Sequence, residues 1–194
     1  MSTTSGKTTA GNFFEDFSVG QIIRHAVPRT VGDGERALYT GLYGTRCAVQ
    51  SSDAFAKAIG YGQAPLDDML VFHIVFGKTV PDISLNAVAN LGYADCRFLK
   101  PVFAGDTLHS PSEVIGVKQN SNGKTGVVYV RSTGMNQHGE LVLEFVRWVM
   151  VRKRDVASDA PDPVVPELPD HVPPAGLGAA CPMIDPSKWD AGLS

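Results

Sequence analysis

The sequence predicts an α+β fold in which a five-stranded antiparallel sheet wraps round one central helix. Three observations predict it. A strand-like segment near the start is followed by helix signals, and four strand-like segments then follow one another. Two of the later connections carry turn signals, which favour antiparallel neighbours. Apolar residues after Pro65 lie on more than one side of a helix, as is typical of a buried helix.

The first part of the predicted domain is one strand and two helices. The strand is expected at residues 21–30. Asp33 can cap the next helix, which should run to about Tyr43, because an aspartate side chain accepts hydrogen bonds from the free N–H groups of a first turn. Ser52 precedes a short helix that Gly60 stops.

The central helix follows Pro65. We expect it to end at Gly77 and Pro81, since both residue types interrupt helices. Its apolar residues wrap more than one stripe: Leu66, Met69, Leu70, Ile74, Val75 and Phe76. Such a helix needs cover on all sides, and a single sheet covers only one.

The rest of the predicted domain is strand. The turns are Asn120-Ser121-Asn122-Gly123 and His138-Gly139, and the strands are expected at 87–99, 107–119, 127–132 and 140–152. An open sheet leaves unpaired edges, and pairing with a second copy would satisfy them. We therefore expect a dimer or a higher assembly.

Composition divides the chain into three parts. Residues 1–12 are a polar leader that we expect to be flexible. Residues 13–155 carry nearly all the periodic apolar pattern. Residues 156–194 hold eight of the thirteen prolines, so this tail is expected to be an extended linker or a strap over a neighbouring surface.

Charge and composition exclude several classes of protein. Seventeen basic residues against twenty acidic ones give a net charge of −3, which predicts no nucleic-acid partner. The longest apolar run, residues 69–76, is too short to span a bilayer, so we expect no membrane association. The three cysteines form no CxxC pair, which argues against a disulfide framework or a metal site and favours the cytoplasm.

Several segments resemble the MaoC-like hydratases, which have the hot-dog fold. They are Tyr43–Ala56, Pro65–Leu70 and Pro101–Leu108. Within that family the chain is similar to the N-terminal half of the mesaconyl-CoA hydratases (β-methylmalyl-CoA dehydratases), whose two halves are fused hot-dog units. That likeness covers about residues 12–155 and is carried by Val71–Ala94, Asn120–Gly126 and Val146–Arg154. The tail resembles the linker that leads to the second half.

The resemblance implies addition of water across a C=C bond beside a thioester. That reaction needs a general base, a general acid and N–H donors for the enolate oxygen. The family supplies Asp and His from a Gly-Asp-x-Asn-Pro-x-His motif. Alignment on Gly44 places Thr45 at the Asp position and Gln50 at the His position. Neither side chain titrates near neutral pH, so the usual dyad is expected to be missing here.

Three further residues near the central helix are candidates. The family opens this helix with a His-Gly pair, and Asp67 and Asp68 stand there. They are either ordinary helix-start residues, which a helix N-terminus favours, or part of an altered site. His73 lies on an otherwise apolar stripe, which favours a core histidine over a catalytic one.

Residues that could contact substrate are less distinctive. Asn86, Asn90 and Arg97 lie at or near a strand at the expected interface, where they either contact an acyl-CoA or satisfy backbone groups. Cys47 could be a nucleophile, but no partner for it can be named. Further basic residues could meet CoA phosphates, although solvated surface charge is the default: Lys100, Lys118, Lys124, Arg131 and 152–154.

Three functional hypotheses follow. The first is a hydratase/dehydratase subunit for a short branched or dicarboxylic acyl-CoA such as mesaconyl-CoA. It would work as a homodimer or with a catalytically complete hot-dog subunit, with no cofactor beyond the CoA of the substrate. The second is a non-catalytic domain that binds acyl thioesters or acts as a scaffold. The third is altered chemistry built on Gln50, Asp67, Asp68 or His73.

Overall fold

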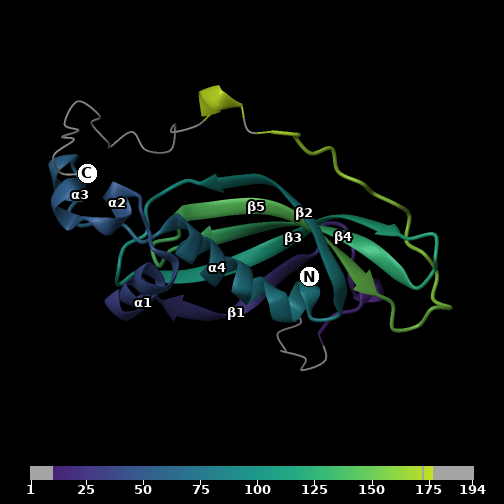
Figure 1. The fold of residues 1–194 in the computed structure, drawn as a ribbon. Coiled ribbons are helices and arrows are strands. Elements are labelled where there is room, and N and C mark those ends of the chain that lie inside the picture. Colours follow the sequence, from purple (N-terminus) through teal and green to yellow (C-terminus); the bar gives the residue numbers. More distant parts are fainter. Residues whose placement is uncertain (1–10, 172, 177–194) are drawn as a thin grey trace.

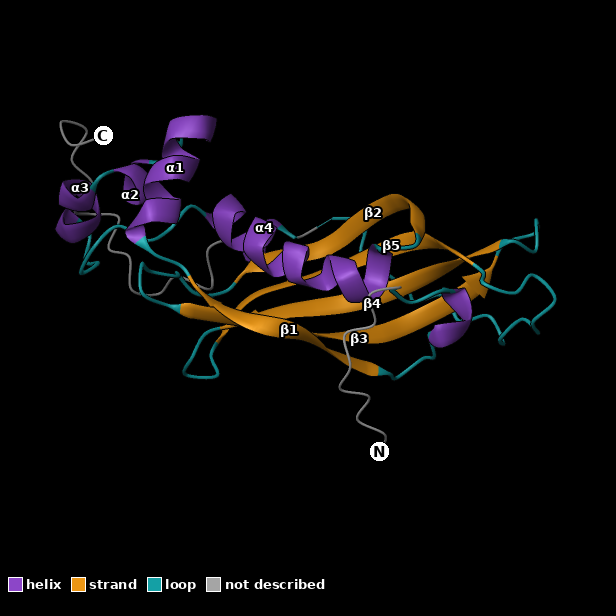
Figure 2. Cartoon of the chain, turned by 90° about the horizontal axis from the view of Figure 1, so that it is seen from below, coloured by secondary structure: helices purple, strands orange, loops and turns teal. Residues whose placement is uncertain are grey.

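A computed structural model describes residues 11–171 and 173–176. It contains a five-stranded antiparallel sheet in the order β1-β3-β4-β5-β2, with a long helix, α4, lying along one face (Figures 1 and 2). The strands are β1 (Ile22–Thr30), β2 (Ala87–Phe98), β3 (Thr107–Gln119), β4 (Thr125–Met135) and β5 (Leu141–Arg152). The predicted sheet and its central helix are thereby confirmed.

The helices come between β1 and β2. They are α1 (Asp33–Tyr43), α2 (Ala48–Ser51), α3 (Asp53–Ala58) and α4 (Asp68–Thr79), with a π-helical turn, η2 (Val80–Ser84), after α4. Two short 3₁₀ turns, η1 (Phe14–Asp16) and η3 (Pro174–Gly176), lie towards the two ends of the described chain. Figure 2 shows α1, α2 and α3 gathered beyond the N-terminal end of α4.

Helix boundaries differ from expectation in three places. Asp33 is the first residue of α1 rather than its cap, and Glu35 instead accepts a hydrogen bond from the Gly32 N–H at 3.0 Å. The turn α2 carried no sequence signal of its own. Gly77 does not end α4, because the helix continues to Thr79 and then widens into η2, with Pro81 inside that turn.

Only one side of α4 is buried. Leu70, Val71, Ile74 and Val75 pack against the inner face of the sheet, in a cluster with residues such as Phe145. Met69 remains 46% exposed on the other side. The expectation of a helix buried on every side is therefore not met within this chain, because a single sheet covers one side only.

A group of buried polar side chains connects β1 to η2, the turn that follows α4. The buried His25 ring bonds through Nδ1 to Asp82 at 2.7 Å and through Nε2 to the Ser112 hydroxyl at 2.8 Å. Ser112 in turn bonds to Ser132 at 2.7 Å. The imidazole thus links two strands to the π-helical turn.

The described part of the proline-rich tail pairs with the sheet at Val164. The N–H of Val164 donates to the Val117 carbonyl at 2.8 Å, on β3 beyond the end of β1. A Cβ at Gly116 would lie 2.6 Å from the Val164 carbonyl oxygen, so glycine permits this close approach. Residues 1–10 of the predicted leader, and residues 172 and 177–194 of the predicted tail, lie outside the described part of the chain.

None of the helices within the described residues combines the length and the apolarity needed to cross a membrane.

Candidate active site at the start of helix α4

Four of the predicted site residues meet at the N-terminus of α4. The Thr45 hydroxyl donates to Oδ2 of Asp67 at 2.7 Å. The Gln50 side chain hydrogen-bonds to the carboxyl group of Asp68. The two residues that the resemblance aligns with the family's dyad are therefore paired, one each, with the two carboxylates that it aligns with the family's His-Gly pair.

Local sequence explains how these groups are brought together. Gly44 ends α1 with φ +63°, a left-handed conformation that suits glycine, and Thr45 follows directly. Gln50 lies on the turn α2. Asp67 caps α4, since its Oδ1 accepts the Met69 N–H at 2.8 Å, and the Leu66 N–H is fixed by the Val102 carbonyl at 2.7 Å.

The site electrostatics are dominated by the two adjacent carboxylates. Burial raises the pKa of Asp68, and the nearby charge of Asp67 raises it further, while the hydrogen bond from Gln50 acts in the opposite direction. The carboxyl group of Asp68 therefore keeps its proton to a higher pH than a free aspartate does. Thr45 and Gln50 can orient a water or a carbonyl, but they cannot exchange protons there.

A groove lies between α1 and α4, on the side of α4 that carries His73 and Gly77. We call it the α1–α4 groove; its volume is about 540 Å³, and it is lined by Arg29, Tyr39, Tyr43, Leu70, His73, Ile74, Gly77 and Lys78. The rings of Tyr39 and Tyr43 are in contact, with centroids 4.4 Å apart and planes tilted by 37°, and the Tyr39 hydroxyl bonds to Nδ1 of His73 at 3.2 Å. Partial burial raises the pKa of Tyr39, and the charge of Asp67 adds to the effect.

The interpretation of His73 as a core histidine is wrong. Its side chain is exposed in the α1–α4 groove, with Tyr39 and Tyr43 beside it. The apolar stripe that predicted burial does exist, because Leu70 and Ile74 are buried against the sheet. His73 lies at the border of that stripe, where the helix surface turns towards solvent.

The predicted substrate-contact residues are spread along β2 and do not converge. Asn86 precedes the strand, and its side-chain amide donates to the Asn12 carbonyl at 3.2 Å. Asn90 is exposed in the middle of β2. Arg97, near the other end, pairs with Asp95 at 2.6 Å. The structure therefore does not bring these three residues into one site.

Some of the basic residues are engaged within the chain. Lys153 is buried and donates to Gln119 and to the Ser158 carbonyl, and Arg154 pairs with Asp16 at 2.6 Å. Lys100 pairs with Glu140 at 2.5 Å. The others are exposed: Lys118, Lys124, Arg131 and Arg152. Cys47 is a free, exposed thiol at the start of α2.

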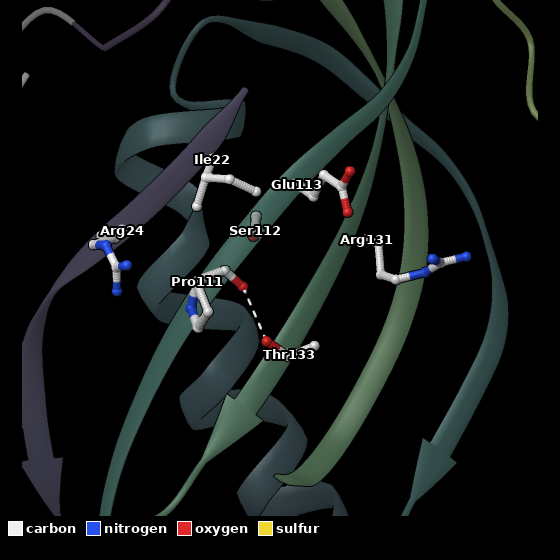
Figure 3. Close-up of a pocket in the computed structure, with 7 residues that line it drawn as sticks. All are labelled: Ile22, Arg24, Pro111, Ser112, Glu113, Arg131 and Thr133. Atoms are coloured by element: carbon white, nitrogen blue, oxygen red, sulfur yellow. Dashed lines mark hydrogen bonds between the residues drawn. The ribbon is translucent and has the colours of Figure 1, made fainter. Parts of the chain in front are cut away.

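A smaller pocket, of about 230 Å³, lies on the outer face of the sheet, away from α4 (Figure 3). Arg24, Glu113 and Arg131 border it, but their side chains point in different directions in Figure 3. Within the described residues, no three His, Cys, Asp or Glu side chains are grouped so that they could hold a metal ion.

Sequence reasoning missed three residues that the structure makes conspicuous. Tyr39 and Tyr43 are four residues apart, a spacing that puts them on one face of a helix and that could have been noticed. Arg147 gave no such signal. It is fully buried on β5, where it donates to the Thr79 hydroxyl at 2.8 Å and lies 4.6 Å above the Phe76 ring.

The family model described as mesaconyl-CoA hydratase matches residues 3–166. A mesaconyl-CoA hydratase of Cereibacter sphaeroides is 64% identical over 180 residues, which are 93% of this chain and 51% of that protein. A β-methylmalyl-CoA dehydratase of Chloroflexus aurantiacus is 63% identical over 89% of this chain and 49% of that protein. The chain thus spans about half the length of these relatives.

Solved structures of similar proteins have the same fold as this chain. A structure from Chloroflexus aurantiacus, described as a MaoC domain protein dehydratase, is 64% identical with a TM-score of 0.84; the match covers 87% of this chain and 48% of that one. A Mycobacterium tuberculosis protein described as having a double hot-dog fold is 28% identical with a TM-score of 0.74, over 96% of this chain and 56% of that one. The predicted hot-dog fold is confirmed.

Proposed function

The chain belongs to the mesaconyl-CoA hydratase family, and from that premise we propose that it is one hot-dog unit of an acyl-CoA hydratase/dehydratase. The substrate class is a short branched or dicarboxylic enoyl-CoA of the mesaconyl-CoA type. The reaction adds water across the C=C bond beside the thioester, or removes it, with no cofactor beyond the CoA of the substrate.

The observation that carries this proposal is the identity of 64% to a mesaconyl-CoA hydratase along nearly the whole chain. Because the aligned part is 51% of that relative, the activity of the longer protein reaches this chain only as a proposal. The chemistry also needs a base for water, an acid for the α-carbon and donors for the enolate oxygen. We therefore ask which of these groups this chain itself can supply.

The contacts at the start of α4 support a unit without its own Asp/His pair. Thr45 is bonded to Asp67, and Gln50 is bonded to Asp68. An enolate oxygen placed at this helix terminus would meet two carboxylates instead of free donors, and like charges repel. We therefore propose that a second hot-dog unit, with a complete Asp/His dyad, supplies the proton transfers.

The edge strand β2 is where we propose that the second unit binds. β2 is paired on one side only, by β5. Val88, Leu91 and Tyr93 on this strand are each more than 40% exposed. An unpaired strand with apolar side chains is suited to main-chain pairing with another chain. We place this assembly in the cytoplasm, consistent with the free thiols of Cys47 and Cys96.

The test is a hydration assay with and without a companion chain. The protein is purified alone and after co-expression with a hot-dog protein that carries Gly-Asp-x-Asn-Pro-x-His. Loss of the enoyl thioester absorbance of mesaconyl-CoA is then measured. We expect no turnover by the chain alone and clear turnover by the pair. Robust turnover by the chain alone would overturn the proposal that the dyad comes from a partner.

The alternative is a domain that binds acyl thioesters without catalysis. The paired carboxylates at the start of α4 favour it, since they fill the place of the oxyanion donors. Under this alternative, mesaconyl-CoA raises the melting temperature of the purified chain, but no companion restores hydration. If the chain alone were active and Asp68→Ala abolished that activity, the altered-chemistry hypothesis would replace both.

A further inference from the structure

The α1–α4 groove has an aromatic wall that extends from the helix surface into solvent. Tyr43 is 67% exposed although its ring contacts that of Tyr39 in a tilted arrangement, and His73 lies beside both rings. Within the described residues His73 makes one side-chain hydrogen bond, to the Tyr39 hydroxyl. Exposed flat rings in a concave site are suited to stacking on a planar base.

The far end of the groove is basic. Arg29, on β1, and Lys78, in the last turn of α4, both line it. Arg29 pairs with Glu35 at 3.1 Å, and Lys78 donates to the Val27 carbonyl. The Arg29–Glu35 pair is exposed on both sides, so it is weak and a phosphate can compete for the guanidinium.

The floor of the groove is open at Gly77. A Cβ built at Gly77 would meet no atom within 4 Å, so the helix surface there is flat and free of side-chain cover. Leu70 and Ile74 continue this floor towards the acidic end of the helix. Gly77 lies about 14 Å along the helix axis from Asp68, at about 1.5 Å per residue.

The two ends of α4 therefore differ in charge. Its start holds the carboxylates of Asp67 and Asp68, outside the groove lining, whereas Arg29 and Lys78 line the groove beside its last turn. An extended pantetheine arm spans the distance between them, so a coenzyme A thioester has matching parts: phosphates for the basic end, adenine for the rings and an apolar arm for the floor. Phosphates at the acidic end would be repelled.

We propose that the α1–α4 groove binds the phosphorylated nucleotide end of a coenzyme A thioester and holds it without turnover. The inference rests on the proposed function for the class of ligand, but the groove itself belongs to this chain. Because Thr45 and Gln50 exchange no protons beside it, the bound thioester stays unreacted there. The groove is then a second, non-reacting nucleotide site in an assembly whose chemistry takes place on the partner unit.

The test is calorimetric titration of the full chain with coenzyme A, with adenosine 3′,5′-bisphosphate and with adenosine. Gly77→Leu fills the groove, and Gly77→Ala is its control, because a Cβ alone meets nothing there. Arg29→Gln removes one groove cation, and Arg24→Gln removes an exposed arginine of the same strand that borders the pocket of Figure 3 instead.

We expect coenzyme A and the bisphosphate to bind, and adenosine to bind at least tenfold more weakly. Gly77→Leu should abolish binding and Gly77→Ala should keep it. Arg29→Gln should weaken binding about tenfold, the loss of one charge-assisted contact, with Arg24→Gln unchanged. Absence of binding, binding that survives Gly77→Leu, or equal losses at Arg24 and Arg29 would each overturn the proposal.

The test of nucleotide binding can fail or succeed independently of the test of hydration. Hydration is measured on the assembly with its companion chain, whereas nucleotide binding is measured on this chain alone. If the assembly hydrates mesaconyl-CoA but this chain binds no nucleotide, only the groove proposal falls. If the chain binds coenzyme A in the groove and no companion restores hydration, the proposed function falls and the groove proposal stands.

Discussion

Asp68 is the residue whose environment most directly predicts a pH effect. Its pKa is raised because burial disfavours the charged form, so the folded state holds this proton more tightly than the unfolded chain does. A raised carboxyl pKa gives stability that is present at low pH and lost as the pH rises through the folded-state value. At neutral pH the ionised Asp68 is therefore a cost to folding.

The first prediction uses Asp68→Asn, which keeps an oxygen that can accept from Gln50. As the pH falls from neutral towards about 4, the usual range of a free aspartate, the melting temperature of the wild type should improve relative to the variant. Scanning calorimetry at several pH values measures the difference between the two proteins. A difference that stays constant with pH would mean that Asp68 has an ordinary pKa.

Arg147 is buried and charged, and within the described residues none of its contacts is to a carboxylate. Burial lowers its pKa to about 10, and its Nε atom has no hydrogen-bond partner within the described residues. Its partners are the hydroxyl groups of Thr79 and Ser84 and the face of Phe76. Burying a charge in such surroundings costs free energy that packing of the side chain only partly offsets.

The second prediction compares two substitutions of Arg147. Arg147→Met keeps most of the buried volume and removes the charge, so the free energy of unfolding should stay within about 1 kcal/mol of the wild type or increase. Arg147→Ala leaves a cavity and should cost roughly 2–4 kcal/mol. Thr79 keeps its bond to the Phe76 carbonyl in both variants. Equal losses in urea denaturation would show that the hydrogen bonds of the guanidinium outweigh its desolvation.

At the scale of secondary-structure elements, one histidine connects β1 to the turn that ends α4. Burial lowers the pKa of His25 and favours the neutral ring, although the hydrogen bond and the charge of Asp82 act in the opposite direction. Arg147 and Lys78 add to the lowering. The neutral ring can donate from Nδ1 to Asp82 and accept at Nε2 from Ser112, which fits both observed contacts.

The third prediction concerns this connection. A base whose folded-state pKa is depressed contributes stability that is present above the unfolded value, about 6.5, and is lost as the pH falls through the folded-state value. The free energy of unfolding should therefore fall between pH 7.5 and about 5, and His25→Gln should make this dependence shallower while costing about 1–3 kcal/mol at pH 7.5. Urea titrations of both proteins measure it. A wild type that gains stability over the variant at pH 5 would instead indicate a protonated His25–Asp82 ion pair.

Most helices and strands could be predicted from local sequence patterns, but some of their ends could not. The strand at 107–119 has the expected bounds, and the helix that follows Gly32 ends at Tyr43 as expected, because alternation and glycine at a helix end are local signals. The continuation of α4 past Gly77 depends on Ile83 packing in a core cluster with β-strand residues, and Arg147 reaching Ser84. No pattern within the helix contains those contacts.

The candidate site was predictable in its members and not in its arrangement. Family register singled out Thr45 and Gln50, and the start of the central helix singled out Asp67 and Asp68. Their pairing was not predictable, because Thr45 meets Asp67, and Gln50 meets Asp68, across a turn and two short helices. His73 was misjudged for a related reason: a helix face shows which residues lie together, but not where the neighbouring sheet ends.

At the scale of the whole molecule, the exposed apolar surfaces fit the proposal that a second hot-dog unit binds at β2. β2 has one free edge, Met69 of α4 is 46% exposed on a side of the helix that does not line the α1–α4 groove, and Leu91 and Tyr93 lie exposed on β2. Phe72 and Phe76 of α4 lie within 5.8 and 6.2 Å of the Tyr93 ring, so the free edge and the open side of the helix form one continuous surface. A partner seated there would bury both together.

The last prediction is that Leu91→Lys weakens assembly while Ile22→Lys does not. Both residues are exposed apolar side chains on edge strands, but Ile22 lies on β1, at the opposite edge of the sheet. A charge buried at the β2 edge should weaken association at least tenfold, the effect of about 1.4 kcal/mol; light scattering after size exclusion measures it, and circular dichroism checks the fold. If Ile22→Lys dissociates the assembly and Leu91→Lys does not, the interface lies at β1. The open side of α4 would then need a different cover, because nothing seated at β1 reaches Tyr93 across the width of the sheet.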